Sequence, residues 1–165
     1  MKVRNVHERR FSTSRAQVGV LIDSLATDGD LLWPSERWPR MRFDRPLARG
    51  AAGGHGPIRY FIESYEPGVR VRFRFTGPRG FDGTHGFESL PLSDGSHLLR
   101  HTLEMKARGA AAVTWPLVYR PLHDALIEDS LTKAGASLGQ EASSCHWSIW
   151  VRLLRRVLGG GRPAR

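Results

Sequence analysis

The chain has 165 residues, 40% of them hydrophobic and 25% charged, which suits one globular domain and is too short for a TIM barrel. A single cysteine, Cys145, rules out an intrachain disulfide and a cysteine-based zinc site. The sequence has no run of about 18 apolar residues and no apolar signal segment near its start, so we expect a soluble, cytoplasmic protein.

The formal net charge of +9 is dominated by arginine. The arginine excess is typical first of a GC-rich genome, and a modestly basic body with a basic tail suggests an anionic surface as partner without identifying one. Arg70, Arg72 and Arg74 form a basic stripe on a predicted strand, yet no aromatic side chains alternate with them on the same face. We therefore expect no nucleic-acid partner, and pairing of this stripe with Glu63 and Glu88 across the sheet.

The first elements are a strand over 3–11 and a helix that begins after Ser14. Ser14 and Gln17 have the spacing of a capping box, and the helix carries apolar residues at helical period. The prolines of the following stretch, 31–41, allow a short second helix at most. The glycine-rich segment 50–56 lacks the G-K-[ST] ending of a phosphate loop and is predicted to be a flexible turn between strands, at the cavity mouth.

The middle of the chain has the period of two that is typical of strands. Two hairpins are predicted, with turns at Pro67-Gly68 and at 93–96, and short segments supply one further strand. The hairpin strands are 58–66 with 69–75 and 84–92 with 97–105, and the short segments are 40–44 and 47–50. Consecutive strands joined by tight turns predict an antiparallel meander.

Residues 112–138 return to helical period and end before Gly139, a plausible stop. Pro116 and Pro121 are expected to kink or delay the first turns. The order of elements predicts an α+β helix-grip fold, in which a curved antiparallel sheet wraps around this long C-terminal helix and leaves a cavity between them. We expect a domain over 1–138 and a basic amphipathic tail over 139–165.

Four segments resemble the START-like, or SRPBCC, superfamily, which includes polyketide cyclases and aromatases, birch-pollen-allergen-like proteins and lipid-transfer domains. They are GGHGPIRYFIESYEPG, VRFRFTGPRGFDGTHGFE, LLRHTLE and WPLVYRPLHDALIEDSL. The resemblance covers about residues 1–138 and is greatest to a largely uncharacterised bacterial branch, polyketide cyclase/dehydrase-like. It implies a deep, mainly apolar pocket and no universal catalytic motif.

Strand parity assigns side chains to this pocket. The odd residues of 69–75 and of 97–105 are mostly apolar, so they face inward, whereas the arginines between them face solvent. If residue 91 lies opposite residue 97, Phe87 faces His101 and His85 lies diagonal to it. The candidate ligand-binding residues are Tyr60, Val71, Phe73, Phe87, His101, Leu103, Tyr119, His123 and Ile127.

Three histidines, His85, His101 and His123, are candidates for acid–base catalysis because an imidazole titrates near neutral pH. They would also serve as neutral core residues or as metal ligands, and we predict neither a metal nor another cofactor. His7, His55 and His97 have the pattern of surface residues. Asp124, Glu128 and Thr132 lie opposite the apolar stripe of the long helix. We expect Asp124, Glu128 and Asp129 to belong to its solvent-exposed face.

These observations predict a protein that binds a small hydrophobic molecule, such as a lipid or polyketide. The alternative is a polyketide cyclase or aromatase-like enzyme in which a pocket histidine or tyrosine moves protons. In the tail, residues 146–158 place Trp147, Trp150, Val151, Leu154 and Leu158 on one helical stripe. That stripe would pack on its own domain, on a second copy in a homodimer, or on a membrane surface as a peripheral contact.

Overall fold

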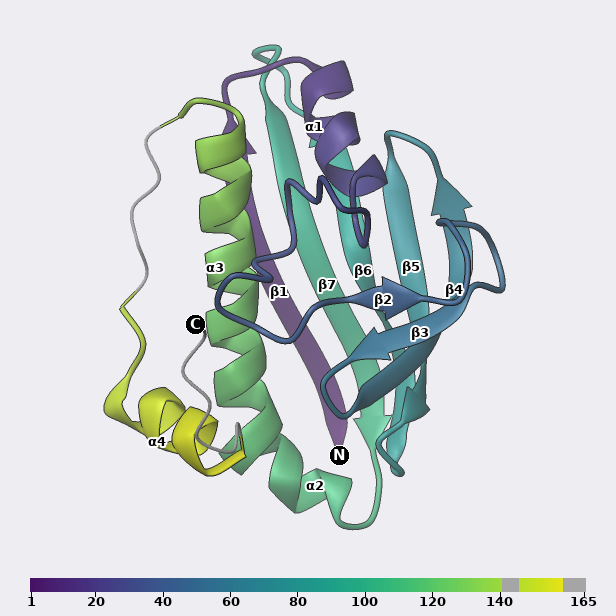
Figure 1. Cartoon of the computed structure of the whole chain (residues 1–165), viewed down its shortest axis with the longest axis vertical. Coiled ribbons are helices and arrows are strands. Elements are labelled where there is room, and N and C mark those ends of the chain that lie inside the picture. The colour runs from purple at the N-terminus through teal and green to yellow at the C-terminus, as the bar shows by residue number, and fades with distance from the viewer. Residues whose placement is uncertain (141–145, 159–165) are drawn as a thin grey trace.

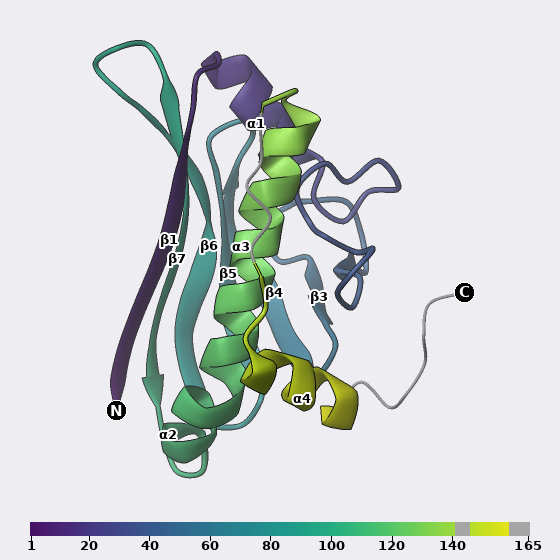
Figure 2. The same cartoon turned by 90° about the vertical axis from the view of Figure 1, so that its left-hand side faces the viewer.

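An antiparallel sheet and a long helix form the two layers of the computed structural model, which describes residues 1–140 and 146–158 (Figures 1 and 2). The strands are β1 (Lys2–Phe11), β2 (Arg42–Phe43), β3 (Ala52–His55), β4 (Ile58–Glu66), β5 (Arg70–Gly77), β6 (Phe81–Pro91) and β7 (His97–Ala107). The helical segments are α1 (Arg15–Asp23), α2 (Ala111–Thr114), the π-helical turn η1 (Trp115–Tyr119), α3 (Arg120–Ser137) and α4 (Ile149–Leu158).

The strands run in the order β1-β7-β6-β5-β4-β3-β2, so all neighbours are antiparallel and only β1 pairs with a strand distant in sequence. Both predicted hairpins are confirmed as β4–β5 and β6–β7. Pro91 lies opposite His97 and Phe87 opposite His101, which is the register assumed from the sequence. The sheet curves along α3, and this arrangement confirms the α+β helix-grip fold (Figure 2).

Strand parity holds on β5. Val71 and Phe73 are buried, whereas Arg70 and Arg72 are exposed. Glu63 binds Arg74 at 2.6 Å, and Glu88 faces Arg70 across the β5–β6 pair. The predicted pairing is therefore confirmed for Glu63, whereas Glu88 has its ion pair with Arg100 at 3.9 Å and Arg70 pairs with Glu66 at 3.3 Å.

The helix that begins after Ser14 has the predicted capping box, because the Ser14 side chain accepts from the Gln17 backbone and the Gln17 side chain accepts from the Ser14 backbone. By contrast, residues 31–41 form no helix. Asp30 holds their first turn instead, since its carboxylate accepts backbone N–H groups of Leu32 and Trp33 at 2.9 and 2.7 Å. The Trp33 indole donates to the Pro39 carbonyl at 3.0 Å and closes the loop.

The glycine-rich segment corrects the sequence-based expectation of a flexible turn. Residues 52–55 are strand β3, paired with both β2 and β4, and residues 47–50 are not a strand. A side chain at Gly53 would place its Cβ 2.0 Å from the Arg42 carbonyl oxygen. Glycine is therefore needed here for close approach of two backbones, a use that composition alone does not distinguish from flexibility.

The long helix begins at Ala111 and is interrupted by η1 before α3. Pro116 and Pro121 have no N–H to donate, so a regular α-helical ladder cannot pass through both positions, and the wider turn absorbs the irregularity. The helix ends at Ser137, and Gly139 has φ +67°, as expected for a glycine stop. No helix within residues 1–140 and 146–158 has both the length and the apolar character needed to cross a membrane.

Candidate ligand-binding cavity

A cavity of about 1280 Å³ lies between the inner face of the sheet and α3, with the loop at 33–39 and α4 around its mouth. Residues of α3 line one side of it, and residues of β6 and β7 line the other. Most wall residues are apolar or aromatic, which is typical of sites for hydrophobic ligands. They include Trp33, Phe75, Phe81, Leu103, Trp115, Tyr119, Leu122, Leu126 and Ile127.

The structure brings five of the nine candidate ligand-binding residues, together with His85, to the cavity wall. These five are His101, Leu103, Tyr119, His123 and Ile127. The remaining four, Tyr60, Val71, Phe73 and Phe87, are buried in the core and do not line the cavity. They support the wall from behind, because Phe73 and Tyr60 pack against the His85 ring, with centroids 5.0 and 4.9 Å away, and Phe87 packs against His101 at 4.7 Å.

His85 on β6 and His101 on β7 form a buried imidazole pair. The His85 Nδ1 and His101 Nε2 atoms are 3.4 Å apart. The outer nitrogens, His85 Nε2 and His101 Nδ1, are buried and have no hydrogen-bond partner among the described residues. Burial lowers the pKa of both rings well below the ordinary value, so both are neutral at physiological pH.

His55 on β3 is a wall residue that the sequence analysis misassigned to the surface. Its Nδ1 lies 3.0 Å from the Tyr60 hydroxyl oxygen, and its ring lies 4.7 Å from the Trp33 ring. Burial lowers the pKa of His55 to about 3 and raises the pKa of Tyr60. The pattern of the loop could not predict this position, because it depends on β3 being part of the sheet.

His123 on α3 points toward the sheet, as the helical wheel predicts, and its ring centroid lies 5.1 Å from that of His101. Neither of its ring nitrogens has a hydrogen-bond partner among the described residues. The nearest carboxylate oxygen, Asp124 Oδ1, is 3.5 Å from Nδ1. Burial lowers the pKa of His123, although the neighbouring Asp124 carboxylate acts in the opposite direction.

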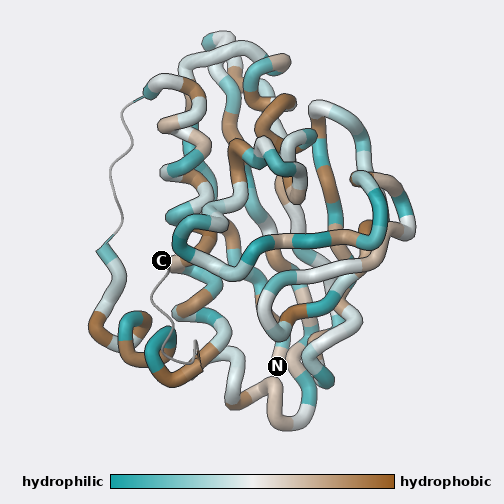
Figure 3. Tube along the Cα trace, in the orientation of Figure 1, coloured by the Kyte–Doolittle hydropathy of each residue, from teal (hydrophilic) through white to brown (hydrophobic). Residues whose placement is uncertain are grey.

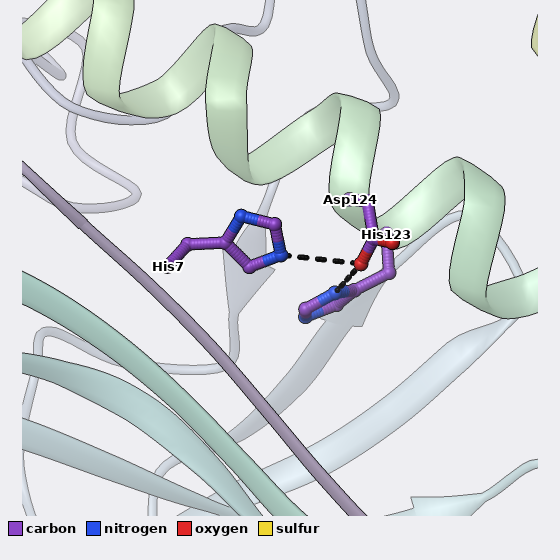
Figure 4. A group of neighbouring side chains, drawn as sticks. All are labelled: His7, His123 and Asp124. Carbon is purple, nitrogen blue, oxygen red and sulfur yellow. Dashed lines mark hydrogen bonds and ion pairs between the residues drawn. The ribbon is translucent and has the colours of Figure 1, made fainter.

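A charged cluster beside His123 links α3 to β1 (Figure 4). It shows that the expectations of a surface position for His7 and of a solvent-facing position for Asp124 and Glu128 were wrong. His7 lies between two carboxylates, with Nδ1 2.7 Å from Glu128 Oε1 and Nε2 3.1 Å from Asp124 Oδ1. Burial lowers the pKa of His7, but the hydrogen bonds and charges of these carboxylates outweigh it and raise the pKa overall. His7 is therefore not an ordinary surface residue. Asp124 and Glu128 face β1 and not open solvent. The Thr132 hydroxyl also faces β1, because it accepts a hydrogen bond from Arg9.

Asp129 is the third carboxylate that the helical wheel misplaced. Only 3% of it is exposed, and it accepts hydrogen bonds from the indoles of Trp38 and Trp147 at 2.7 and 3.0 Å and from Arg37 at 2.8 Å. The Arg155 guanidinium stacks on both indole rings. Segment 146–158 thereby packs on its own domain, which was one of the three arrangements considered for it.

The last misassigned histidine, His97, is also buried, and its Nδ1 lies 3.3 Å from the Thr13 carbonyl oxygen. The errors at His7, Asp124 and Glu128 have one cause. The sequence gives the period of a single element, but β1 pairs with β7 across the whole chain and covers the flank of α3 that looks solvent-facing on a wheel.

The arrangement offers ordered polar groups in an apolar wall. Neutral imidazoles follow one another from His123 through His101 to His85, and the His55–Tyr60 pair adjoins them. Each neutral ring can donate one hydrogen bond and accept one. Their unpaired nitrogens can orient a polar group of an otherwise hydrophobic molecule, or accept and return a proton.

No protein-family model matches the chain, and no curated protein matches its sequence. Its structure is similar to those of CalU16 from Micromonospora echinospora (TM-score 0.58, 13% identity, 94% of this chain and 83% of that chain) and of truncated norcoclaurine synthase from Thalictrum flavum (0.61, 14%, 86% and 96%). A Thermobifida fusca protein is similarly related (0.58, 16%, 88% and 98%). At these identities the likeness shows the fold alone, which is the helix-grip fold.

Proposed function

We propose that the chain binds a small hydrophobic molecule, such as a lipid or a polyketide, in the cavity between the sheet and α3. The observation that carries this proposal is the apolar and aromatic wall around about 1280 Å³ of space. A core of this size would ordinarily be filled by side chains, because protein interiors are close-packed. The histidines in the wall would fix the orientation of the ligand through its polar groups.

Native mass spectrometry of freshly purified protein tests whether a small molecule accompanies the chain. Binding is then measured with the apolar dye 8-anilinonaphthalene-1-sulfonate. Leu122→Trp should narrow the cavity, because Leu122 lines it and is only half-buried, and should weaken saturable dye binding. Leu98→Trp, on a half-buried β7 position outside the cavity, is the matched control. Equal dye binding by both variants and the unchanged protein would refute the proposal.

A polyketide cyclase or aromatase-like enzyme is the second candidate. The observation that favours it is the His85–His101 pair, whose outer nitrogens are buried and unpaired. A neutral imidazole can take a proton from a carbon next to a carbonyl and return it elsewhere. One structural neighbour is a norcoclaurine synthase point mutant in complex with a transition-state analogue, so the same fold supports an enzyme.

The two candidates differ in what happens to a bound polyketide. A binding protein returns it unchanged, whereas a cyclase converts it, and His101→Gln should then slow conversion more than it weakens binding. If His101→Gln lowers the free energy of unfolding and leaves both binding and conversion unchanged, the pair is structural.

A further inference from the structure

Three potential metal ligands meet at the seam between β1 and α3, at the back of the cavity wall. They belong to His7, His123 and Asp124, and one ligand atom of each residue lies within 4.8 Å of the other two. Asp124 Oδ1 is 3.1 Å from His7 Nε2 and 3.5 Å from His123 Nδ1. Figure 4 shows both imidazoles directed at this one oxygen.

These separations are those of ligands that share a tetrahedral cation. Zinc binds nitrogen and oxygen at about 2.0–2.2 Å, so two of its ligands lie roughly 3.3 Å apart. A small rotation of the Asp124 side chain would place a cation between the three atoms. Two imidazoles and one carboxylate are also a donor set that divalent transition metals accept.

The surroundings of His7 supply a second, independent observation. Its other ring nitrogen, Nδ1, lies 2.7 Å from Glu128 Oε1, and Glu128 is held in turn by Arg9 at 3.1 Å. Metal-bound histidines regularly donate their second N–H to a carboxylate, which fixes the ring and its tautomer. Glu128 therefore holds Nε2 of His7 in the orientation that a metal ligand requires.

The third observation is that some buried polar atoms of this cluster have no hydrogen-bond partner among the described residues. Among the described residues, the buried side-chain atoms of this cluster without a hydrogen bond are both ring nitrogens of His123 and the Asn5 oxygen. Asn5 Nδ2 donates to Asp124 Oδ1 at 2.8 Å, so its amide oxygen lies beside the same group. Hydrogen bonds among the acidic and basic residues account for both ring nitrogens of His7 but for neither of His123, and a cation at this place would give His123 Nδ1 a partner.

We propose that His7, His123 and Asp124 bind a divalent transition-metal ion of the zinc type, with Glu128 positioning His7. This site is separate from the histidine pair His85–His101. Because His123 also lines the cavity, the ion would lie at the cavity wall.

Zinc binding by the full chain, first dialysed against a chelator, is measured by isothermal titration calorimetry, and Co²⁺ absorption reports the geometry. We expect one equivalent of zinc and a tetrahedral cobalt spectrum. Asp124→Asn and His7→Gln should each weaken zinc binding by at least tenfold. Glu128→Gln should weaken it about 10- to 100-fold, as loss of an outer carboxylate does. Circular dichroism checks that each variant is folded.

The control variant is Cys145→Ser with His146→Ala, which removes the adjacent thiol and imidazole of the tail. Unchanged zinc binding by this variant supports the proposal. Absence of stoichiometric binding would overturn it, as would binding that is lost in the tail control and retained in Asp124→Asn. If His7→Gln does not fold, the conservative Asp124→Asn decides the question by itself.

A different observation concerns helix α4. Val151 and Leu154 of the predicted stripe are buried, whereas Trp150 and Leu158 of the same stripe are exposed. Hydrophobic residues recur along the whole of α4 (Figure 3), and several of them form an exposed outer face. Ile149 and Val157 are 81% and 71% exposed, and Trp150 and Leu153 are each 47% exposed. The Trp150 indole donates to the Leu117 carbonyl at 2.8 Å, which joins this outer face to the exposed Leu117 side chain.

The charges beside the outer face indicate what covers it. Arg152 and Arg156 are exposed on α4, and no acidic residue lies on this helix. An apolar face flanked by arginine suits a bilayer with anionic lipids, where the apolar groups enter the interface and the arginines meet phosphates. Arg152, Arg156 and Leu158 also line the mouth of the cavity.

We infer that the outer face of α4 docks on an anionic lipid surface. Full-length protein should sediment with vesicles of phosphatidylcholine and 30% phosphatidylglycerol, and far less with phosphatidylcholine alone. Ile149→Glu with Val157→Glu should abolish sedimentation. Ala52→Glu with Thr76→Glu adds the same charge at exposed sheet positions and should reduce sedimentation only slightly.

Two results would overturn the docking inference. One is equal sedimentation of both double variants. The other is a dimer in solution that the α4 variant dissociates, with no vesicle binding by either form, since a second copy would then be the occupant of the face.

Discussion

The histidines of this cavity wall stay uncharged, because burial lowers the pKa of their imidazole rings. His55 shows the consequence for stability most directly, because its pKa is about 3 in the folded protein against 6.5 for an ordinary histidine. As pH falls, the unfolded chain takes up a proton before the folded chain does. The contribution of the neutral His55 ring is therefore full above pH 6.5 and is lost as pH falls toward 3.

Replacing His55 by Phe should make the stability of the protein less sensitive to acid. The slope of the unfolding free energy against pH, between pH 6 and 4, should fall by up to about 1.4 kcal/mol per pH unit, which corresponds to one proton. Urea unfolding at several pH values measures this slope. His146→Gln, at an exposed histidine, is the control. An unchanged slope in His55→Phe would show that His55 is hydrated in the folded protein.

At the scale of elements, one buried carboxylate helps to hold the segment that carries α4 on the body of the protein. Asp129 accepts from Trp147 of the tail segment while it also accepts from Trp38 and Arg37. Asp129→Asn would replace one acceptor oxygen by an NH₂ group that faces N–H donors. We expect a loss of about 2–4 kcal/mol in unfolding free energy, because two indole N–H groups and the Arg37 guanidinium would lose the carboxylate that they bind.

Two measurements check the role of Asp129. Urea unfolding gives the loss of stability, and limited trypsin digestion reports faster cleavage at Arg152 and Arg156 once α4 loosens. Glu36→Gln removes a carboxylate from an exposed ion pair with Lys133 and should cost less than about 1 kcal/mol. If the two variants lose equal stability, Asp129 does not anchor the helix.

The same scale shows what the sequence could predict. Period and turn residues were sufficient for β4–β5, for β6–β7 and for the inward direction of His85, His101 and His123, because each depends on one element or one hairpin. They were not sufficient for His7, Asp124 and Asp129. The contacts of these residues cross more than 90 positions of the chain or depend on the tail, so no local pattern contains them.

At the scale of the whole molecule, the resemblance found in four segments predicted the helix-grip fold correctly, whereas the residues of the cavity wall depend on contacts between distant elements. The division into a domain over 1–138 and a tail over 139–165 stays a prediction. In the structure the domain already contains the complete sheet and α3, and the tail adds Val151 and Leu154 to the buried surface.

Deleting residues 141–165 should therefore leave a folded protein that is less stable. Asp129 would lose the Trp147 donor, and Arg155 would leave the Trp38 ring. We expect a loss of about 1–3 kcal/mol in unfolding free energy, the range for one hydrogen bond to a charged group with its packing. Circular dichroism and thermal unfolding measure this loss, and the strand and helix content of the shortened chain should persist. An unfolded product would mean that the tail completes the domain, and a melting temperature equal to that of the full chain would mean that α4 adds nothing to its stability.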